Sequence, residues 1–149
     1  MKIYIDQSSK IEYTSKHTVI AYANSKQKAI LIEAREKQKV EKMFREAKKP
    51  YIFRYKTLAI LIYLLIKNDL PKISSIIIDK EYIGKEPLIK DFLIQIIRKK
   101  TNSKITQDDI SFQLIGKHNK AHEAAINVFR KKTSANKIIT AEDVAPFVV

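Results

Sequence analysis

The stretch Ile73-Ser74-Ser75-Ile76-Ile77-Ile78-Asp79 is a nearly continuous apolar run that ends on a carboxylate. Strands covered on one face alternate apolar and polar residues, whereas strands covered on both faces do not. An apolar segment at residues 57–67 precedes the run, and residues 87–100 follow it with apolar side chains at helical spacing. This order predicts helix, buried strand, helix, with Asp79 at the strand's carboxyl end, where open α/β sheets bind ligands.

Asp79 has two interpretations. A carboxylate buried beside isoleucines costs free energy unless it is paired or holds a metal ion. The alternative is a solvated residue that only ends the strand.

The remaining chain predicts a mixed sheet. Residues 2–6 read Lys-Ile-Tyr-Ile-Asp, a short strand that also ends on a carboxylate, Asp6. The β-rich segments 11–23 and 28–33 predict two further strands of an antiparallel meander, and the alternation over 110–115 predicts the last strand. With the helical segments between them, the order predicts an α/β fold: a five-stranded sheet, three antiparallel strands followed by two parallel ones, with helices on both faces.

Two further segments complete the organisation. Residues 35–49 show helical spacing with seven Lys or Arg against three Glu, and a last helix follows Gly116. We expect one domain over residues 1–132 and a C-terminal tail or short helix over 133–149.

The charge is strongly unbalanced. The 149 residues include 29 Lys or Arg and 16 Asp or Glu, giving a net charge of +13 and a pI of about 9.8. Such an excess of positive charge indicates a polyanionic partner such as nucleic acid. The alternative, a thermophile composition, enriches both Lys and Glu and would leave the two signs balanced. The absence of cysteine excludes disulfides and thiolate metal sites. The basic residues expected to contact phosphates are Lys37, Lys42, Lys48, Lys99, Lys100, Lys117 and Lys120.

No secretory or membrane signal is visible. The longest apolar run, residues 58–66, lies between Lys56 and Lys67, and a membrane span needs about 20 residues. We expect a core helix there, no membrane partner and a cytoplasmic protein.

Three short motifs, taken in order, resemble the ribonuclease H-like superfamily of ribonucleases H, Holliday-junction resolvases and transposases. Residues 3–8 resemble its first strand, apolar and ending in Asp followed by a small polar segment. Residues 77–82 resemble its Asp-x-x-Tyr, and residues 116–125 its Gly-His loop and Asn-x-x-Ala-Asp-x-x-Ala helix. The resemblance implies that the first and fourth strands are parallel neighbours. Asp6 and Asp79 would then meet and hold Mg²⁺ or Mn²⁺ for phosphodiester hydrolysis.

The sequence departs from the family pattern at two positions. Lys56 aligns where some members carry a helical Glu, for which Glu33 or Glu36 could substitute. His122 stands where the last Asp is expected, with Glu123 beside it. On a helix His122 falls toward the sheet and Glu123 toward solvent, so His122 is the better candidate for a metal ligand or general base. His118 and His122 also have the i, i+4 spacing of a zinc-binding pair, or are ordinary helix-entry histidines.

Three hypotheses remain open at this point. The first is a metal-dependent nuclease acting on structured DNA or an RNA–DNA hybrid, with Asp6, Asp79, His122 and Glu123 as its site. The second is a catalytically degenerate module of the same fold that binds nucleic acid or a ribonucleoprotein without cleaving it. The third is a structural protein that docks through its C-terminal tail.

Overall fold

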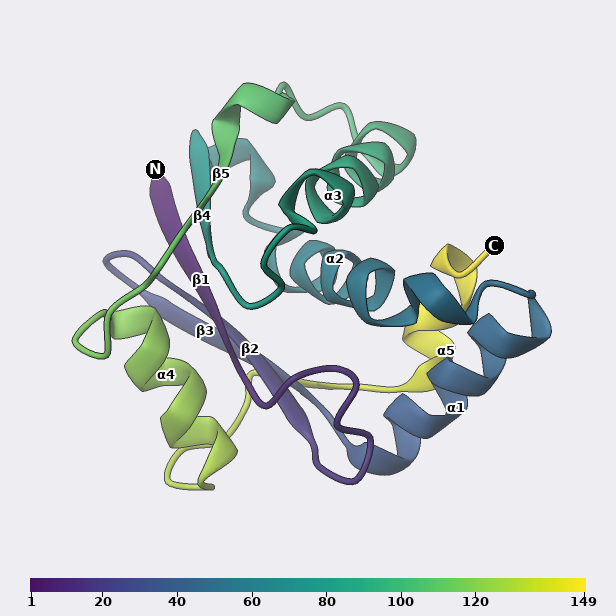
Figure 1. The fold of residues 1–149 in the computed structure, drawn as a ribbon. Coiled ribbons are helices and arrows are strands. Elements are labelled where there is room, and N and C mark those ends of the chain that lie inside the picture. The colour runs from purple at the N-terminus through teal and green to yellow at the C-terminus, as the bar shows by residue number, and fades with distance from the viewer.

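The computed structural model describes all residues, 1–149. It shows an α/β fold in which one twisted sheet carries helices on both faces (Figure 1). The strands are β1 (Lys2–Ser8), β2 (Thr18–Ala23), β3 (Gln27–Ile32), β4 (Ser75–Asp79), β5 (Ile110–Gln113) and β6 (Lys137–Ile139). The helices are α1 (Ala34–Glu46), α2 (Phe53–Ile66), α3 (Glu86–Lys100), α4 (Lys120–Phe129) and α5 (Ala141–Val144).

The sheet is mixed, in the order β5-β4-β1-β2-β3-β6. β1, β2 and β3 pair antiparallel, while β4 pairs parallel with β1 and β5 pairs parallel with β4. The predicted antiparallel meander followed by two parallel strands is therefore confirmed, as are helices on both faces. The predicted count of five strands is wrong, because β6 adds a sixth beside β3.

The C-terminal segment supplies the sixth strand. β6 has three residues and pairs parallel with β3. Asn136 fixes this pairing: its backbone N–H donates to the Ala29 carbonyl and its side chain accepts from the Ala29 N–H, both at 2.8 Å. Thr140 then caps α5, and Ile139 and Val144 are fully buried. A three-residue strand is too short to show a hydrophobic period, so the sequence pattern did not reveal it.

The two faces of the sheet are covered differently (Figure 1). On one face α1, α2 and α3 enclose the larger core, and ten of the fourteen residues of α2 are buried. A helix that is apolar on all sides in this way is an interior helix. On the other face α4 packs alone, with Ala124, Ala125 and Val128 against Val19 and Ala21 of β2. The small side chains bring α4 close to the carboxyl half of β1.

The register between β1 and β4 positions the two predicted aspartates. Tyr4 pairs with Ile77 and Ile5 with Ile78, so Asp6 and Asp79 follow side by side at the carboxyl ends of parallel strands. Ile5 and Ile78 point into the larger core. Because side chains alternate along a strand, Asp6 and Asp79 point to the face that α4 covers. The predicted parallel pairing of the first and fourth strands is confirmed.

None of the helices combines the length and the apolar composition that a membrane crossing requires.

Candidate metal centre

Three carboxylates meet at the carboxyl end of β1 and β4. One ligand oxygen from each of Asp6, Asp79 and Glu81 lies within 4.8 Å of the other two. The chain turns tightly after β4, with the Glu81 N–H donating to the Asp79 carbonyl at 3.1 Å, which brings Glu81 back over the strand end. Glu81 was not among the residues predicted from the sequence, because it lies in the tight turn after the strand, where no regular spacing of side chains signals it.

Backbone and side-chain donors hold the two aspartates in place. Asp79 Oδ1 accepts from the Ile115 N–H at 2.7 Å, which ties the end of β4 to the β5–α4 connection. Asp6 Oδ1 accepts from the N–H of Gln7 at 2.8 Å, and Asp6 Oδ2 lies 2.9 Å from His122 Nδ1. Each aspartate thus has one oxygen fixed by a main-chain donor.

The group is electrostatically crowded. Burial, together with the adjacent charge of Asp79, raises the pKa of Asp6 to about 6, although His122 and the Gln7 N–H act in the opposite direction. Burial, contact with Asp79 and the charges of Asp79 and Asp6 raise the pKa of Glu81 to about 7. Carboxylates that retain protons to neutral pH are a mark of functional sites, because a bound cation would remove the repulsion between them.

A small cavity lies beside the carboxylates. Its volume is about 10 Å³, and its walls include Asp6, Asp79, Glu81, Gln7 and Leu58. Gln7 is buried, and neither the nitrogen nor the oxygen of its side-chain amide has a hydrogen-bond partner. The space is close to the minimum that one water molecule occupies. Carboxylate oxygens are hard ligands, so the three carboxylates fit Mg²⁺ or Mn²⁺ and not a thiophilic metal.

His122 contacts one of these carboxylates directly. Asn119 caps α4 by accepting from the Ala121 N–H at 2.8 Å, so His122 lies in the first turn, over Asp6. Its side chain is 35% exposed. With Nδ1 engaged by Asp6, Nε2 is the nitrogen left to accept a proton or a metal ion. The structure therefore brings together three of the four predicted site residues: Asp6, Asp79 and His122.

Glu123 and His118 lie apart from this group. Glu123 is exposed on α4, on the solvent side that its helical position predicts. The structure therefore does not bring Glu123 to the carboxylates, because the adjacent helical position faces away when His122 faces the sheet. His118 is exposed in the turn before Asn119, so it is not one helical turn from His122, and of the two alternatives for these histidines the arrangement does not fit a zinc-binding pair.

Lys56, which aligns with the family's helical Glu, and the two predicted substitutes for that Glu all have partners or positions other than the carboxylate group. Lys56 packs over the Phe92 ring, 5.6 Å from its centroid, with Nζ 3.5 Å from the Val148 carbonyl. It therefore adds no cation to the centre, and the residue that α2 contributes to the cavity wall is Leu58. Glu36 is occupied by the Ala141 N–H at 2.9 Å and by Lys39, and Glu33 is exposed ahead of α1.

One of the predicted phosphate-binding residues is buried. Lys37 has no exposed surface, and its Nζ donates to the Tyr13 carbonyl at 2.7 Å, to Thr18 Oγ1 at 2.8 Å and to the Lys10 carbonyl at 3.3 Å. Its prediction as a nucleic-acid contact is wrong, because the ammonium replaces its hydration with three oxygens of the chain. The other predicted contacts are exposed: Lys42, Lys48, Lys99, Lys100, Lys117 and Lys120.

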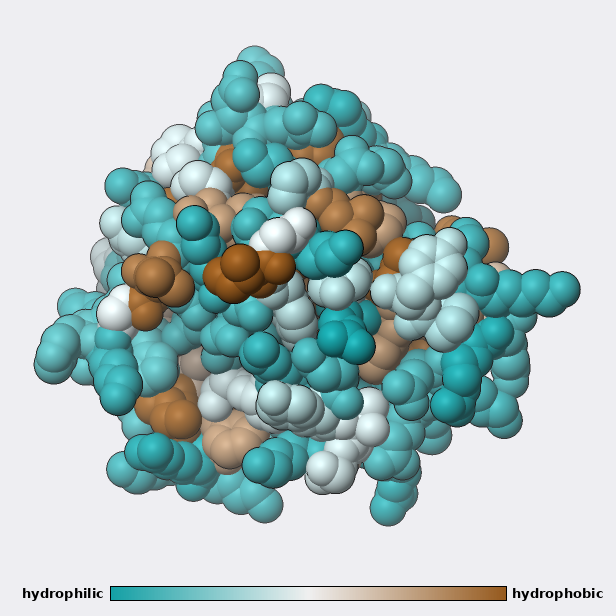
Figure 2. All heavy atoms as spheres, in the orientation of Figure 1, coloured by the Kyte–Doolittle hydropathy of each residue, from teal (hydrophilic) through white to brown (hydrophobic).

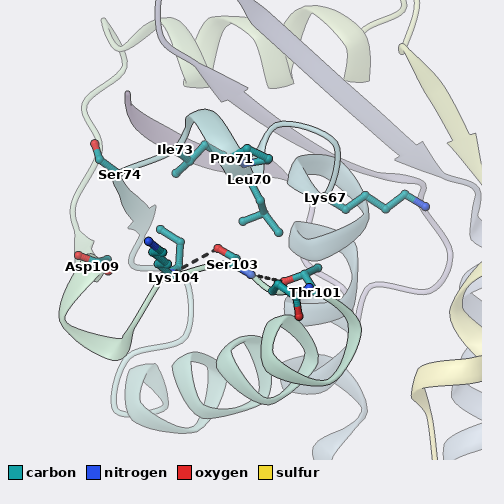
Figure 3. A pocket seen from close by; sticks show the side chains of 11 residues that line it. Lys67, Leu70, Pro71, Ile73, Ser74, Thr101, Ser103, Lys104 and Asp109 are labelled. Atoms are coloured by element: carbon teal, nitrogen blue, oxygen red, sulfur yellow. Dashed lines mark hydrogen bonds between the residues drawn. The ribbon is translucent and has the colours of Figure 1, made fainter.

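The largest pocket lies at the opposite end of β4. It has a volume of about 550 Å³ and lies between the segment before β4 and the segment after α3 (Figure 3). Its hydroxyls serve the local backbone: Thr101 Oγ1 accepts from the Ser103 N–H, and Ser103 Oγ accepts from the Ile105 N–H (Figure 3). The pocket holds a single carboxylate, Asp109, and no histidine, so it offers no comparable set of catalytic groups.

Asp6, Asp79 and Glu81 form the one group of three or more His, Cys, Asp or Glu side chains that lie close enough to share a metal ion. No family model, curated protein or solved structure matches this chain.

Proposed function

We propose that the protein is a divalent-metal-dependent nuclease that acts on structured DNA or an RNA–DNA hybrid. The observation that carries this proposal is the group of three carboxylates within 4.8 Å of one another at the carboxyl ends of two parallel strands. The chain that carries this acidic group has a net charge of +13. The positive charge of the protein would attract a polyanionic substrate. The acidic group would hold the metal ion that acts on one of its phosphates.

The strand arrangement supports a ribonuclease H-like assignment. The order β3-β2-β1-β4-β5, with β4 and β5 parallel to β1, agrees with the arrangement that the sequence resemblance implies. We assign β6 as an addition to this pattern at the β3 edge. The assignment rests on topology and three short motifs.

Asp6, Asp79 and Glu81 would hold Mg²⁺ or Mn²⁺, with Glu81 in the role that a helical Glu takes elsewhere in the superfamily. When bound, such an ion polarises a phosphoryl oxygen and lowers the pKa of a coordinated water. The residues supply the negative charge that attracts the ion. The donors from Ile115 and Gln7 keep Asp79 and Asp6 oriented before it arrives.

His122 is the candidate proton acceptor. In the tautomer that donates Nδ1–H to Asp6, Nε2 carries a lone pair on the exposed side of the ring. As water oxygen bonds to phosphorus and the ester P–O bond breaks, Nε2 would take the proton that water loses, and the departing alkoxide would take a proton from solvent water to leave as the alcohol. Asp6 would stabilise the resulting imidazolium, because its Oδ2 is already in contact with Nδ1 of the ring.

The second candidate function is binding of nucleic acid without cleavage, by a protein of the same fold. It is favoured by Leu58, which places an apolar wall where α2 meets the cavity. Three ligands then remain where some family members offer four. In that case the protein binds nucleic acid or a ribonucleoprotein, and the carboxylates stay protonated in part.

A cleavage assay separates the two functions. The protein is incubated with labelled four-way junction, duplex DNA and RNA–DNA hybrid, with Mg²⁺, Mn²⁺ or EDTA. The nuclease proposal expects cleavage of at least one substrate that requires the divalent ion and that falls by orders of magnitude in Asp79→Asn. Binding without cleavage under every condition would favour the second function.

A further inference from the structure

Two large apolar side chains are exposed next to the carboxylate group. Ile83 is 75% exposed and Leu114 is 79% exposed, more than every other large apolar residue except the C-terminal Val149. Ile83 lies two residues after Glu81, and Leu114 directly precedes Ile115, whose N–H bonds to Asp79. We call this pair the apolar rim. Isolated apolar side chains are common on surfaces, but the backbone that carries each of these two is held by hydrogen bonds.

A rigid turn presents Ile83. The Lys85 N–H donates to the Tyr82 carbonyl at 3.0 Å, and Gly84 has a φ of +87°, which makes residues 82–85 a type II turn with Ile83 at its tip. Tyr82 anchors the turn, because its hydroxyl accepts from the Ile11 N–H at 3.0 Å and donates to Glu12 at 2.9 Å. Ile83 therefore projects from a fixed backbone.

Leu114 is held on the other side of Asp79. The Lys80 N–H donates to the Gln113 carbonyl at 3.0 Å, and the Ile115 N–H donates to Asp79 Oδ1 at 2.7 Å. Both neighbours of Leu114 are thus bonded to the end of β4. Ile83 and Leu114 thus lie on two backbone segments that adjoin Glu81 and Asp79 in the structure, each held by its own hydrogen bonds.

The surroundings of the apolar rim are basic. Lys80 and Lys85 flank Ile83 in the chain, Lys117 and Lys120 follow Leu114, and all four are exposed. Figure 2 shows isolated brown atoms amid a largely hydrophilic surface on the face that carries the β4–α3 and β5–α4 connections. An apolar patch within a cationic surface suits a ligand with anionic phosphates and apolar base faces.

We propose that the apolar rim stacks against unpaired nucleobases, and that the centre therefore takes nucleic acid whose bases are unpaired beside the reacting phosphate. This inference rests on the proposed function, since it names the substrate class of that site. Bases in a continuous duplex have their faces covered by their neighbours, whereas mismatched, branched or single-stranded segments expose them. Apolar side chains are used in this way as wedges between base steps.

The test is a binding measurement in EDTA, where no cleavage occurs. Fluorescence anisotropy compares a continuous duplex with the same duplex carrying a central run of mismatched pairs. The proposal expects roughly tenfold tighter binding of the mismatched DNA, equivalent to about 1.4 kcal/mol. The double variant Ile83→Ser, Leu114→Ser should lose this preference and keep its duplex affinity. Ile138→Ser removes an exposed isoleucine from β6, at the other edge of the sheet, and should change neither value.

A second readout reports contact directly. 2-Aminopurine placed among the mismatched bases should change its fluorescence with the wild-type protein and not with the double variant. Equal affinity of the wild type for both DNAs, or an unchanged preference in the double variant, would overturn the inference. So would a wild-type dimer that becomes monomeric in the double variant without a change in DNA preference, since the rim would then be a contact between copies. Stabilisation by Mn²⁺ tests the metal centre separately, so failure of the two proposals can be told apart.

Discussion

His122 Nδ1 lies 2.9 Å from Asp6 Oδ2, joining the first turn of α4 to the carboxyl end of β1 across 116 residues of sequence. The carboxylate is 3% exposed and the imidazole 35% exposed, so the pair spans from the protein interior to solvent. The contact fixes the ring and selects Nε2 as the nitrogen that faces outward. It resembles the carboxylate–histidine pairs that orient a general base.

His122→Ala should lower divalent-dependent cleavage by roughly 10²–10⁴-fold, the usual contribution of a general base. His122→Gln is the matched control: its amide can still donate to Asp6 but cannot accept a proton at neutral pH. Full activity in His122→Gln would show that His122 only positions Asp6.

Without a metal ion, stability should fall as pH rises from about 4 to 7. Asp6 and Glu81 have folded-state pKa values of about 6 and 7, above the values of about 4 expected when unfolded. The folded state therefore binds more protons than the unfolded state in this window, and its stabilisation is lost as they leave. We expect the Tm in EDTA to drop between pH 5 and 8, in the direction that these two raised pKa values set.

Glu81→Gln should flatten this slope, because the variant removes one of the two titrating groups and part of the repulsion on Asp6. Glu123→Gln is the matched control, since Glu123 is exposed on α4, away from the carboxylates. Equal slopes for wild type and Glu81→Gln would contradict the crowded arrangement of the three carboxylates.

Lys37 should contribute to stability and not to binding. Lys37→Ala removes three hydrogen bonds that tie the β1–β2 connection to α1. It should cost about 2–4 kcal/mol in urea denaturation, whereas the exposed Lys42→Ala should change stability by less than about 0.5 kcal/mol.

Lys37 also has a pH signature. Burial lowers the pKa of Lys37 to about 8. The unfolded state then binds more protons above that pH, so wild-type stability should gain a rising contribution between about pH 8 and 10 that Lys37→Met lacks. An unchanged pH profile in Lys37→Met would contradict this assignment.

Nucleic-acid affinity should fall steeply with salt, by about 0.9 log units per contacted phosphate for each log unit of salt on duplex DNA. Lys117→Ala and Lys120→Ala, in the connection that leads to His122, should each reduce this slope by about one contact. Lys42→Ala, on α1, is the comparison at another place in the fold. Absence of duplex affinity at low salt would reject nucleic acid as the partner.

The sheet was largely predictable because its signals were local. The buried run that ends at Asp79 and the β-rich residues around Thr18–Ala23 each defined a strand by composition. β6 was not predictable, since its three residues depend on pairing with β3 and on the two hydrogen bonds of Asn136.

Within the site, Asp6 and Asp79 followed from strand ends, and His122 followed from the apolar face of α4. Glu81 depended on a tight turn that no period describes. Lys37 was misread because its basic helix resembles a solvated face, and only the loop that folds over it reveals its burial. Lys56 was misplaced because an alignment fixes a position along a helix but not the side of the helix that faces the centre.

The claim that Asp6, Asp79 and Glu81 form a metal centre is tested most directly by thermal unfolding at pH 8 with and without Mn²⁺. We predict that Mn²⁺ raises the Tm of the wild-type protein, because only the folded state brings the three carboxylates together. Asp79→Asn keeps an acceptor for the Ile115 N–H and removes one charge. It should be more stable than the wild type in EDTA and should lose the response to Mn²⁺. A wild-type Tm that is indifferent to Mn²⁺, alongside a stabilised Asp79→Asn, would contradict the metal centre and the nuclease proposal with it.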